Sequence, residues 1–205
     1  MRELERIYYN QRAREYDDWY LGLGLHEARS RPGWNEELRT VQDLIASWRF
    51  LEPLDVACGT GFLTRNFKHA VTGIDQSHAM LAEAQSAVHQ GRFVQADAFN
   101  MPFRSQQFDG ALIAHFYGHL LENDRAAFLN EARRVARDLV FIDSALRPGV
   151  AAESIQERVL KDGSRHGVYK RYFTPEMLSN ETGATEILHA GTWFVAALRR
   201  GIEGG

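Results

Sequence analysis

Short apolar runs alternate with longer amphipathic stretches through the middle of the chain. The runs occupy residues 54–57, 71–75, 92–95, 109–114 and 139–143. Runs of this length that alternate with helical stretches are typical of buried strands joined by crossover helices. The pattern therefore predicts an α/β fold with a doubly wound, mostly parallel sheet.

The stretches between these runs predict helices. We expect helices at residues 61–67 and 78–88, with Ser77 as the N-cap of the second. Asn123 or Asp124 is expected to cap a further helix, whose apolar face would pack on the sheet.

The C-terminal part of the chain predicts one helix and one hairpin. Thr174-Pro175-Glu176 combines a cap, a proline in the first helical position and an acidic first turn, which together start a helix. Residues 185–188 and 193–198 predict two strands joined by a short turn. We expect this antiparallel pair to close the parallel sheet.

Two amphipathic stripes occupy the first fifty residues, with glycines and a proline between them. We expect residues 1–50 to form a helical lid over an α/β core of residues 54–205, within one domain. The stripes consist of Tyr9, Ala13, Tyr16 and Tyr20, and of Trp34, Leu38, Val41, Ile45 and Trp48.

Composition narrows the class of protein. The 205 residues suffice for one domain, and the hydrophobic (44%) and charged (25%) fractions are ordinary for a globular protein. The net charge of −3 gives no bulk positive field for nucleic acid, and the single cysteine, Cys58, excludes an internal disulfide framework. The first twenty residues are rich in charge, and no apolar run approaches the ~20 residues of a membrane span. We expect a cytoplasmic monomer or homodimer with no membrane or nucleic-acid partner.

A turn of small residues follows the first predicted strand. In Asp55-x-Ala57-x-Gly59-x-Gly61, the glycines allow the backbone to approach a ligand, and the expected helix behind them favours an anion. The third glycine of the dinucleotide fingerprint is missing, and no Gly-Lys-Ser/Thr of a P-loop is present. A purely structural turn is an equal alternative for this segment alone.

Two aspartates end the next two predicted strands. Asp75 lies twenty residues after Asp55, and Asp97 lies a further twenty-two along the chain. Ligands of such sheets bind outside the carboxyl ends of the strands, where a carboxylate can accept ribose hydroxyls or an adenine amino group. A helix cap for Asp75 and a loop position for Asp97 are the structural alternatives. The coincidence of the three turns predicts an adenosine site.

These segments resemble the motifs of the class I S-adenosylmethionine-dependent methyltransferases, of the small-molecule type related to the menaquinone and ubiquinone enzymes. The resemblance extends over residues 8–199 and rests on residues 54–61, 71–77 and 95–98, with Met101-Pro102-Phe103 after them. It implies a Rossmann-like, seven-stranded sheet whose last strand is antiparallel. It also implies S-adenosylmethionine as cofactor and S-adenosylhomocysteine as product.

The resemblance further implies which residues bind the cofactor. The turn of residues 57–61 would face the methionine end, Asp75 would hold the ribose, and Asp97 with Ala98 would contact the adenine edge. Tyr16 would cover the cofactor from the lid. The full expected set is Tyr16, Asp55, Ala57, Cys58, Gly59, Thr60, Gly61, Asp75, Gln76, Met80, Asp97, Ala98, Ala114 and His115.

The chain departs from the family pattern in two places. Ala57 stands where the first glycine of the turn is usual, and residues 133–138 lack the Leu-x-Pro-Gly-Gly turn that normally precedes the fifth strand. The first change is small and the second is remote from the expected cofactor. We therefore expect an altered surface rather than lost binding.

The candidate catalytic residues lie in His115-Phe116-Tyr117-Gly118-His119, after the fourth predicted strand. Either histidine can act as a base near neutral pH, although a base is needed only when the acceptor holds its proton. For His119, packing at a helix start is an equal alternative. The spacing of the histidines also suits a metal, which we reject because no third ligand is evident. We therefore expect His119, His115 or Tyr117 to serve catalysis, and no metal.

Two later segments bear on the methyl acceptor. Residues 170–173, Lys-Arg-Tyr-Phe, either present positive charge to an anionic acceptor or form a solvated strand. Asp143-Ser144 ends the fifth predicted strand, on the ligand side of the sheet.

The leading hypothesis is in-line methyl transfer from S-adenosylmethionine to a small molecule. A regulatory protein that binds the same cofactor without turnover is the non-enzyme alternative. An RNA or protein methyltransferase would need a basic face or an added recognition domain, and neither is visible in the sequence. An NAD-dependent oxidoreductase is disfavoured because the third glycine is missing.

Overall fold

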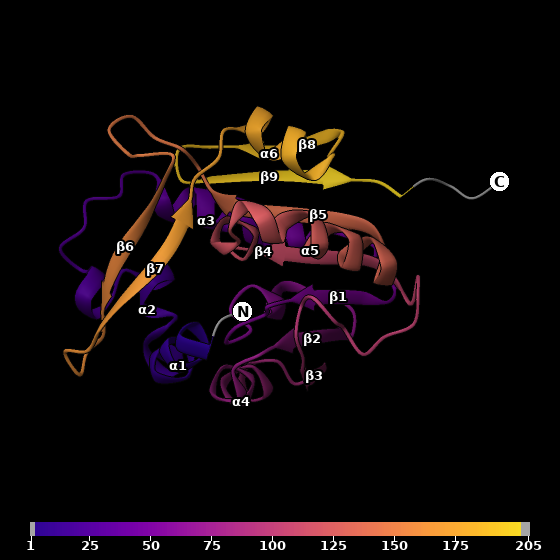
Figure 1. Cartoon of the computed structure of the whole chain (residues 1–205), viewed down its shortest axis with the longest axis horizontal. Helices are drawn as coiled ribbons and strands as arrows, with labels where there is room; N and C mark the ends of the chain where they lie inside the picture. The colour runs from indigo at the N-terminus through magenta and orange to yellow at the C-terminus, as the bar shows by residue number, and fades with distance from the viewer. Residues whose placement is uncertain (1–2, 202–205) are drawn as a thin grey trace.

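The computed structural model describes residues 3–201, and its centre is a seven-stranded sheet (Figure 1). The strand order is β3-β2-β1-β4-β5-β9-β8, in which β9 runs antiparallel to both of its neighbours. This sheet confirms the predicted fold class, including the C-terminal hairpin. The strands are β1 (Pro53–Val56), β2 (Val71–Asp75), β3 (Gly91–Gln95), β4 (Phe108–Ala114), β5 (Ala136–Ser144), β8 (Glu186–Ala190) and β9 (Phe194–Arg199).

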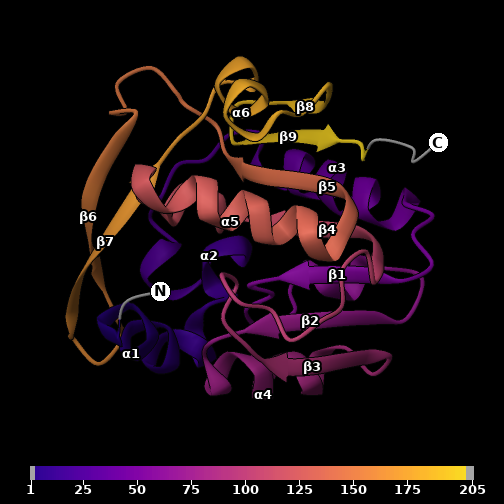
Figure 2. The same ribbon diagram turned by 45° about the vertical axis from the view of Figure 1, so that its right-hand side comes forward.

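Helices cover both faces of the sheet, which explains why the central strands are apolar on both sides. On one face, α5 (Glu122–Val135) packs through Phe128 and Ala132, and α6 (Pro175–Thr182) packs through Leu178. On the other face, α3 (Trp34–Ser47) packs through the stripe that the sequence predicted. Figure 2 shows α5 in front of β4 and β5, and α3 behind them. Each fully buried large side chain contributes roughly 1.5–3 kcal/mol to this core.

Two predicted helix starts are confirmed by their caps. The Met80 N–H donates to Ser77 Oγ (3.1 Å) at the start of α4 (His78–Ala87), and the Met177 N–H donates to Thr174 Oγ1 (3.2 Å) at the start of α6. The expected cap of α5 is wrong. That helix begins at Glu122, after an extended Leu121, so Asn123 and Asp124 lie inside its first turn.

The helix expected at residues 61–67 is also wrong, because only the short 3-10 turn η3 (Thr64–Asn66) forms there. Two side chains form hydrogen bonds in this turn. The Thr64 hydroxyl donates to Asp55 Oδ2 (2.6 Å), and the Asn66 amide donates to the Leu63 carbonyl (2.9 Å). The argument from a helix dipole therefore does not apply to this turn.

The N-terminal segment is a series of short helices rather than one long one. It contains α1 (Glu3–Arg12), η1 (Ala13–Glu15), α2 (Asp18–Leu21) and η2 (Gly24–His26). Gly22 ends α2 in a left-handed conformation (φ of 69°), as the glycine break predicted. The arrowheads of β1 and β2 point toward α1 and α2 in Figure 2, so these helices lie at the carboxyl ends of the strands.

Between β5 and α6 the chain forms a separate two-stranded hairpin of β6 (Glu153–Val159) and β7 (Arg165–Arg171). It was not predicted beyond the possible strand at residues 170–173. Leu160 and Val168 of this hairpin region pack on Tyr8 of α1. The hairpin and the N-terminal helices thus enclose the same end of the sheet (Figure 1). Among residues 3–201, no helix is both long and apolar enough to cross a bilayer.

Candidate functional site

The turn after β1 is held in backbone conformations that favour glycine. Ala57, Gly59 and Gly61 all have positive φ angles, of 57°, 55° and 76°. A Cβ atom on Gly61 would lie 3.0 Å from Val88 Cγ2 beside the end of α4, and the positive φ would strain any other residue there. Ala57 adopts this conformation although it is not glycine, at a cost of roughly 1 kcal/mol. This strain lies on the ligand side of the sheet.

Asp75 fixes the turn to the end of β2. Its Oδ2 accepts from the Gly59 N–H (3.0 Å), and its Oδ1 accepts from the Ser77 N–H (2.8 Å). Burial raises the pKa of Asp75 to about 6, against the lowering effect of these two hydrogen bonds. The carboxylate thus both orders the turn and faces the space beside it.

A narrow cleft runs from this turn toward the loop after β4. A small side hollow adjoins it at Asp75 and Ala57 and is lined further by Ile74, Gln76, Ala96, Ala98 and Phe116. The narrow cleft is lined by Tyr9, Tyr16, Ala57, Gly59, Asp75, Met80, Ala114, His115, Phe116, His119, Leu120 and Val168.

The two spaces bring together most, but not all, of the predicted cofactor residues. Tyr16, Ala57, Gly59, Asp75, Met80, Ala114 and His115 line the cleft, and Gln76 and Ala98 line the side hollow. Neither space is lined by Asp55, Cys58, Thr60, Gly61 or Asp97.

The predicted residues outside these spaces have structural partners. Asp55, 2% exposed, accepts the Thr64 hydroxyl, while the exposed Asp97 accepts from the Phe99 N–H (3.0 Å). Cys58 lies under Gly73, where a Cβ atom would meet its Sγ at 3.0 Å. Asp55 and Cys58 thus lie behind the site, and Asp97 lies in an exposed turn outside both spaces.

The N-terminal segment is fastened onto the turn. Asp17 accepts from the Thr60 hydroxyl (2.5 Å) and pairs with Arg65 (3.0 Å), and Tyr16 lies beside Gly59. Asp17 could not be singled out from the sequence, because its partners lie more than forty residues away. Tyr16 lines the cleft, and its contact with the cofactor stays a prediction.

His115 stands where the cleft opens into a larger cavity. Its φ is 53°, its side chain is 6% exposed, and neither ring nitrogen has a hydrogen-bond partner within residues 3–201. Burial lowers the pKa of His115 to about 4, although the nearby Asp143 opposes the shift. A buried imidazole with two unsatisfied nitrogens is costly, and a ligand in the adjoining space can satisfy it.

His119 is held by the hairpin. Its Nδ1 donates to the Tyr169 carbonyl (2.7 Å), since a carbonyl only accepts, and this leaves Nε2 without a proton in the neutral ring. Burial lowers the pKa of His119 to about 3, with a further lowering from Lys170. Such a ring is a weak base. Tyr117, the third candidate, is 1% exposed and packs among Phe128, Phe141 and Phe173, so it lines neither the cleft nor the larger cavity.

Lys170 and Asp143 form a buried ion pair with a distance of 2.5 Å. The same Asp143 accepts from the Gly118 N–H (2.7 Å), which anchors the loop between β4 and α5. Lys170 is 4% exposed and belongs to β7, so the expectation of a solvated strand is wrong at this residue. Its charge is balanced by Asp143.

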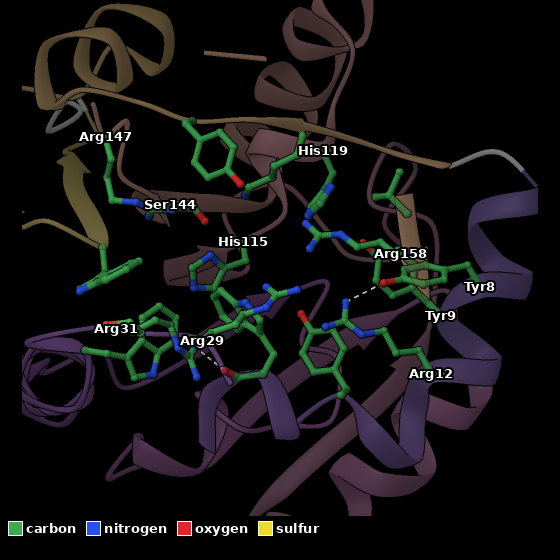
Figure 3. A pocket seen from close by; sticks show the side chains of 18 residues that line it. Tyr8, Tyr9, Arg12, Arg29, Arg31, His115, His119, Ser144, Arg147 and Arg158 are labelled. Atoms are coloured by element: carbon green, nitrogen blue, oxygen red, sulfur yellow. Dashed lines mark hydrogen bonds between the residues drawn. The ribbon is translucent and has the colours of Figure 1, made fainter. Parts of the chain in front are cut away.

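The larger cavity has a volume of about 410 Å³ and adjoins the cleft through Tyr9, Tyr16, His115, His119 and Val168, which line both. Figure 3 shows its side chains, which come from the N-terminal helices, the loops after β4 and β5, and the hairpin. The other lining residues are Tyr8, Arg12, Trp19, Arg29, Ser30, Arg31, Trp34, Ser144, Arg147, Arg158, Lys170, Tyr172 and Trp193.

Comparisons with known proteins agree with this architecture. Residues 54–140 match the family described as "Methyltransferase domain". The demethylmenaquinone methyltransferase of Thermotoga maritima is 35% identical over 104 residues, which cover 48% of this chain and 44% of that protein. The O-methyltransferase cnsE of Penicillium expansum is 29% identical over 151 residues, which cover 67% of this chain and 50% of that protein. The chain thus spans half or less of the length of these curated relatives.

A solved structure shares the fold over nearly the whole chain. The complex of DhpI with SAH superposes with a TM-score of 0.75 at 24% identity and covers 97% of this chain and 96% of that one. The family match and the shared fold confirm the predicted resemblance to the class I S-adenosylmethionine-dependent methyltransferases.

Proposed function

We propose that this protein transfers a methyl group from S-adenosylmethionine to a small-molecule acceptor and releases S-adenosylhomocysteine. The observation that carries the proposal is the cleft formed by the strained turn and Asp75, which opens at His115 into a second cavity. Two adjoining spaces are what a two-substrate transfer requires. The names of the curated relatives support methyl transfer, and DhpI, which shares the fold, has been solved with SAM and with SAH.

The residues present fit this cofactor. Apolar side chains line the side hollow, as an adenine ring requires, and a carboxylate lies at its edge for ribose hydroxyls. Asp75 would hold the ribose, Gln76 and Ala98 would flank the adenine, and the turn with Ala114 would face the methionine end. When bound, S-adenosylmethionine supplies a methyl group already activated on a sulfonium.

The protein's own contribution is alignment and exclusion of water. Tyr16 and Tyr9 cover the cleft from the lid, and the hairpin closes the opposite side. Holding the nucleophile of the acceptor in line with the methyl group makes the transfer effectively unimolecular. Because burial keeps His115 and His119 neutral and weakly basic, we assign them positioning roles rather than proton abstraction.

Isothermal titration calorimetry with S-adenosylhomocysteine tests the cofactor assignment. We expect Asp75→Asn to weaken binding at least tenfold, because the amide accepts fewer hydroxyl hydrogen bonds and lacks the charge. Asp124→Asn, on the exposed first turn of α5, is the matched control and should bind like the wild type. Equal affinity of Asp75→Asn and wild type would contradict the ribose assignment.

Turnover is tested with the purified protein and a library of small metabolites, by measuring release of S-adenosylhomocysteine. Acceptor-dependent release that Asp75→Asn abolishes supports the proposal. Tight cofactor binding with no release across the library would instead favour the regulatory alternative.

A further inference from the structure

Arginine side chains crowd the large cavity beside the cleft. Arg12 comes from α1, Arg29 and Arg31 from the loop before α3, Arg147 from the loop after β5, and Arg158 from β6. No aspartate or glutamate is among the residues that line it. In Figure 3 the five guanidinium groups lie around the same space as His115 and His119. Four separate segments thus deliver positive charge to one place.

We propose that this cavity binds a small organic oxyanion, a carboxylate or phosphoryl compound, as the methyl acceptor. The inference rests on the proposed function and names its substrate class. Guanidinium groups suit this ligand because their planar forks donate two parallel hydrogen bonds to a carboxylate or phosphate.

The hydrogen-bond partners of these arginines are neutral. Arg12 donates to the Tyr8 hydroxyl (2.8 Å), Arg31 to the Trp19 carbonyl (2.7 Å), and Arg158 to the Gln156 side-chain oxygen (2.6 Å). Arg147 lies over the Trp193 ring, 4.3 Å from its centroid. Among residues 6–201, whose side chains the structure describes, none of the five arginines forms a salt bridge with a carboxylate. Their charges therefore remain available to a ligand.

Other cations of the same region show a different arrangement. Lys170 lines the cavity too, but Asp143 neutralises it at 2.5 Å. Arg171, the next residue of β7, pairs with Glu153 and Glu181. The chain thus supplies carboxylate partners to neighbouring cations and leaves the cavity arginines without them.

This concentration of like charge is unfavourable in the absence of an anion. Partial burial, and after it the charge of Arg158, lowers the pKa of Arg29. The pKa of Arg31 is also lowered, first by burial and then by the charge of Arg29. A bound oxyanion replaces this repulsion with attraction, so its binding should stabilise the folded state.

The shape of the site sets the size of the ligand. A concave cavity of about 410 Å³ lies in the range typical of small-molecule sites. The net charge of the chain is −3, so the positive charge is local to this cavity and not a surface for nucleic acid. Since Tyr9, Tyr16, His115 and His119 line both spaces, an oxyanion held here lies beside the methionine end of the cleft. His115, with its unpaired ring nitrogens, is placed to donate a hydrogen bond to it.

The test measures anion binding to the full chain without cofactor, so it is independent of the methyl donor. The thermal unfolding midpoint is followed against phosphate, malonate or citrate, with chloride at equal ionic strength as the reference. We expect a saturable rise for at least one oxyanion at low millimolar concentration. A response to phosphate alone assigns a phosphoryl ligand, and a response to the carboxylates alone assigns a carboxylate ligand. No rise beyond chloride for any oxyanion overturns the proposal.

Variants locate the binding. We expect Arg29→Gln and Arg158→Gln each to weaken oxyanion affinity at least fivefold, while S-adenosylhomocysteine affinity stays within twofold. The unfolding midpoint without anion should stay equal or rise, because repulsion is relieved, whereas loss of a structural arginine would lower it. Arg165→Gln removes an exposed arginine of the same hairpin that pairs with Glu157, and it should keep wild-type oxyanion affinity. Unchanged affinity in both cavity variants would overturn the proposal.

Discussion

At the scale of single residues, the burial of Asp55 behind the turn makes the stability of the fold depend on pH. Asp55 is 2% exposed, and burial raises its pKa to about 7, although the Thr64 hydroxyl opposes this shift. An unfolded aspartate has a pKa near 3.9. Between about pH 4 and 7 the folded protein therefore holds a proton that the unfolded chain releases. The free energy of unfolding contributed by this group falls as pH rises through that window.

We predict that Asp55→Asn reduces this loss of stability with pH, because the amide keeps the acceptor for Thr64 and does not ionise. The difference in unfolding midpoint between Asp55→Asn and the wild type should therefore increase from pH 5 to pH 8 in favour of the variant. Part of the slope will remain, since burial also raises the pKa of Asp75 to about 6. Thermal unfolding of wild type, Asp55→Asn and the exposed control Asp124→Asn checks this. Parallel curves for all three proteins would show that Asp55 stays ionised in the fold.

The sequence located the residues of the site that belong to local motifs. Asp75 ends β2, Ala57 and Gly59 follow β1, and Ala98 follows β3, and parallel strands place such residues at one edge. Asp17 and the cavity arginines were missed because their positions depend on contacts between distant segments. Nothing in the pattern around Arg29 or Arg147 distinguishes a ligand-binding arginine from a surface one.

At the scale of elements, the strands were easier to predict than the connections. Burial on both faces makes residues 110–114 of β4 and 139–142 of β5 continuously apolar, which is visible in the sequence. The hairpin β6–β7 alternates partly buried and exposed residues and buries only a few apolar side chains, so its signal is weak. In place of the helix expected after β1 there is a 3-10 turn, in which the Asn66 amide donates to the Leu63 carbonyl; periodicity does not reveal such side-chain competition for a backbone group.

The segment from α1 to α2 is the element that we expect to move. The cleft beneath it is narrow, so we expect Tyr16 to shift when a cofactor enters. Asp17 holds the segment in place through its hydrogen bond with Thr60 and its ion pair with Arg65. We predict that Asp17→Ala increases amide hydrogen exchange of residues 3–21 about tenfold, which corresponds to roughly 1.4 kcal/mol of local stability. Exchange mass spectrometry with and without S-adenosylhomocysteine measures this.

Asp43→Ala, on the exposed face of α3, is the control for this effect and should leave that exchange unchanged. We expect the cofactor to slow exchange of residues 3–21 in the wild type. If Asp17→Ala exchanges like the wild type throughout this segment, Asp17 does not fasten the lid.

At the scale of the whole molecule, one segment contributes to both binding spaces. Tyr9 and Tyr16 line the cleft and the large cavity, and Arg12, between them, lines the cavity. The Arg12 guanidinium lies over the Tyr16 ring, 4.6 Å from its centroid, so its position depends on the residue that we propose covers the cofactor. Closure of the lid over a cofactor therefore also places a cationic group for the oxyanion.

This shared segment predicts coupled binding. Whichever ligand binds first orders the lid, so binding of the second ligand costs less conformational entropy. We expect S-adenosylhomocysteine to tighten binding of the responsive oxyanion about fivefold, and the oxyanion to tighten S-adenosylhomocysteine by the same factor, because coupling free energies are reciprocal. Calorimetric titration of each ligand in the absence and in the presence of the other measures both factors. Arg12→Gln should abolish the coupling and still bind S-adenosylhomocysteine in the absence of the oxyanion. If each affinity of the wild type is unaffected by the other ligand, the lid serves the cofactor only.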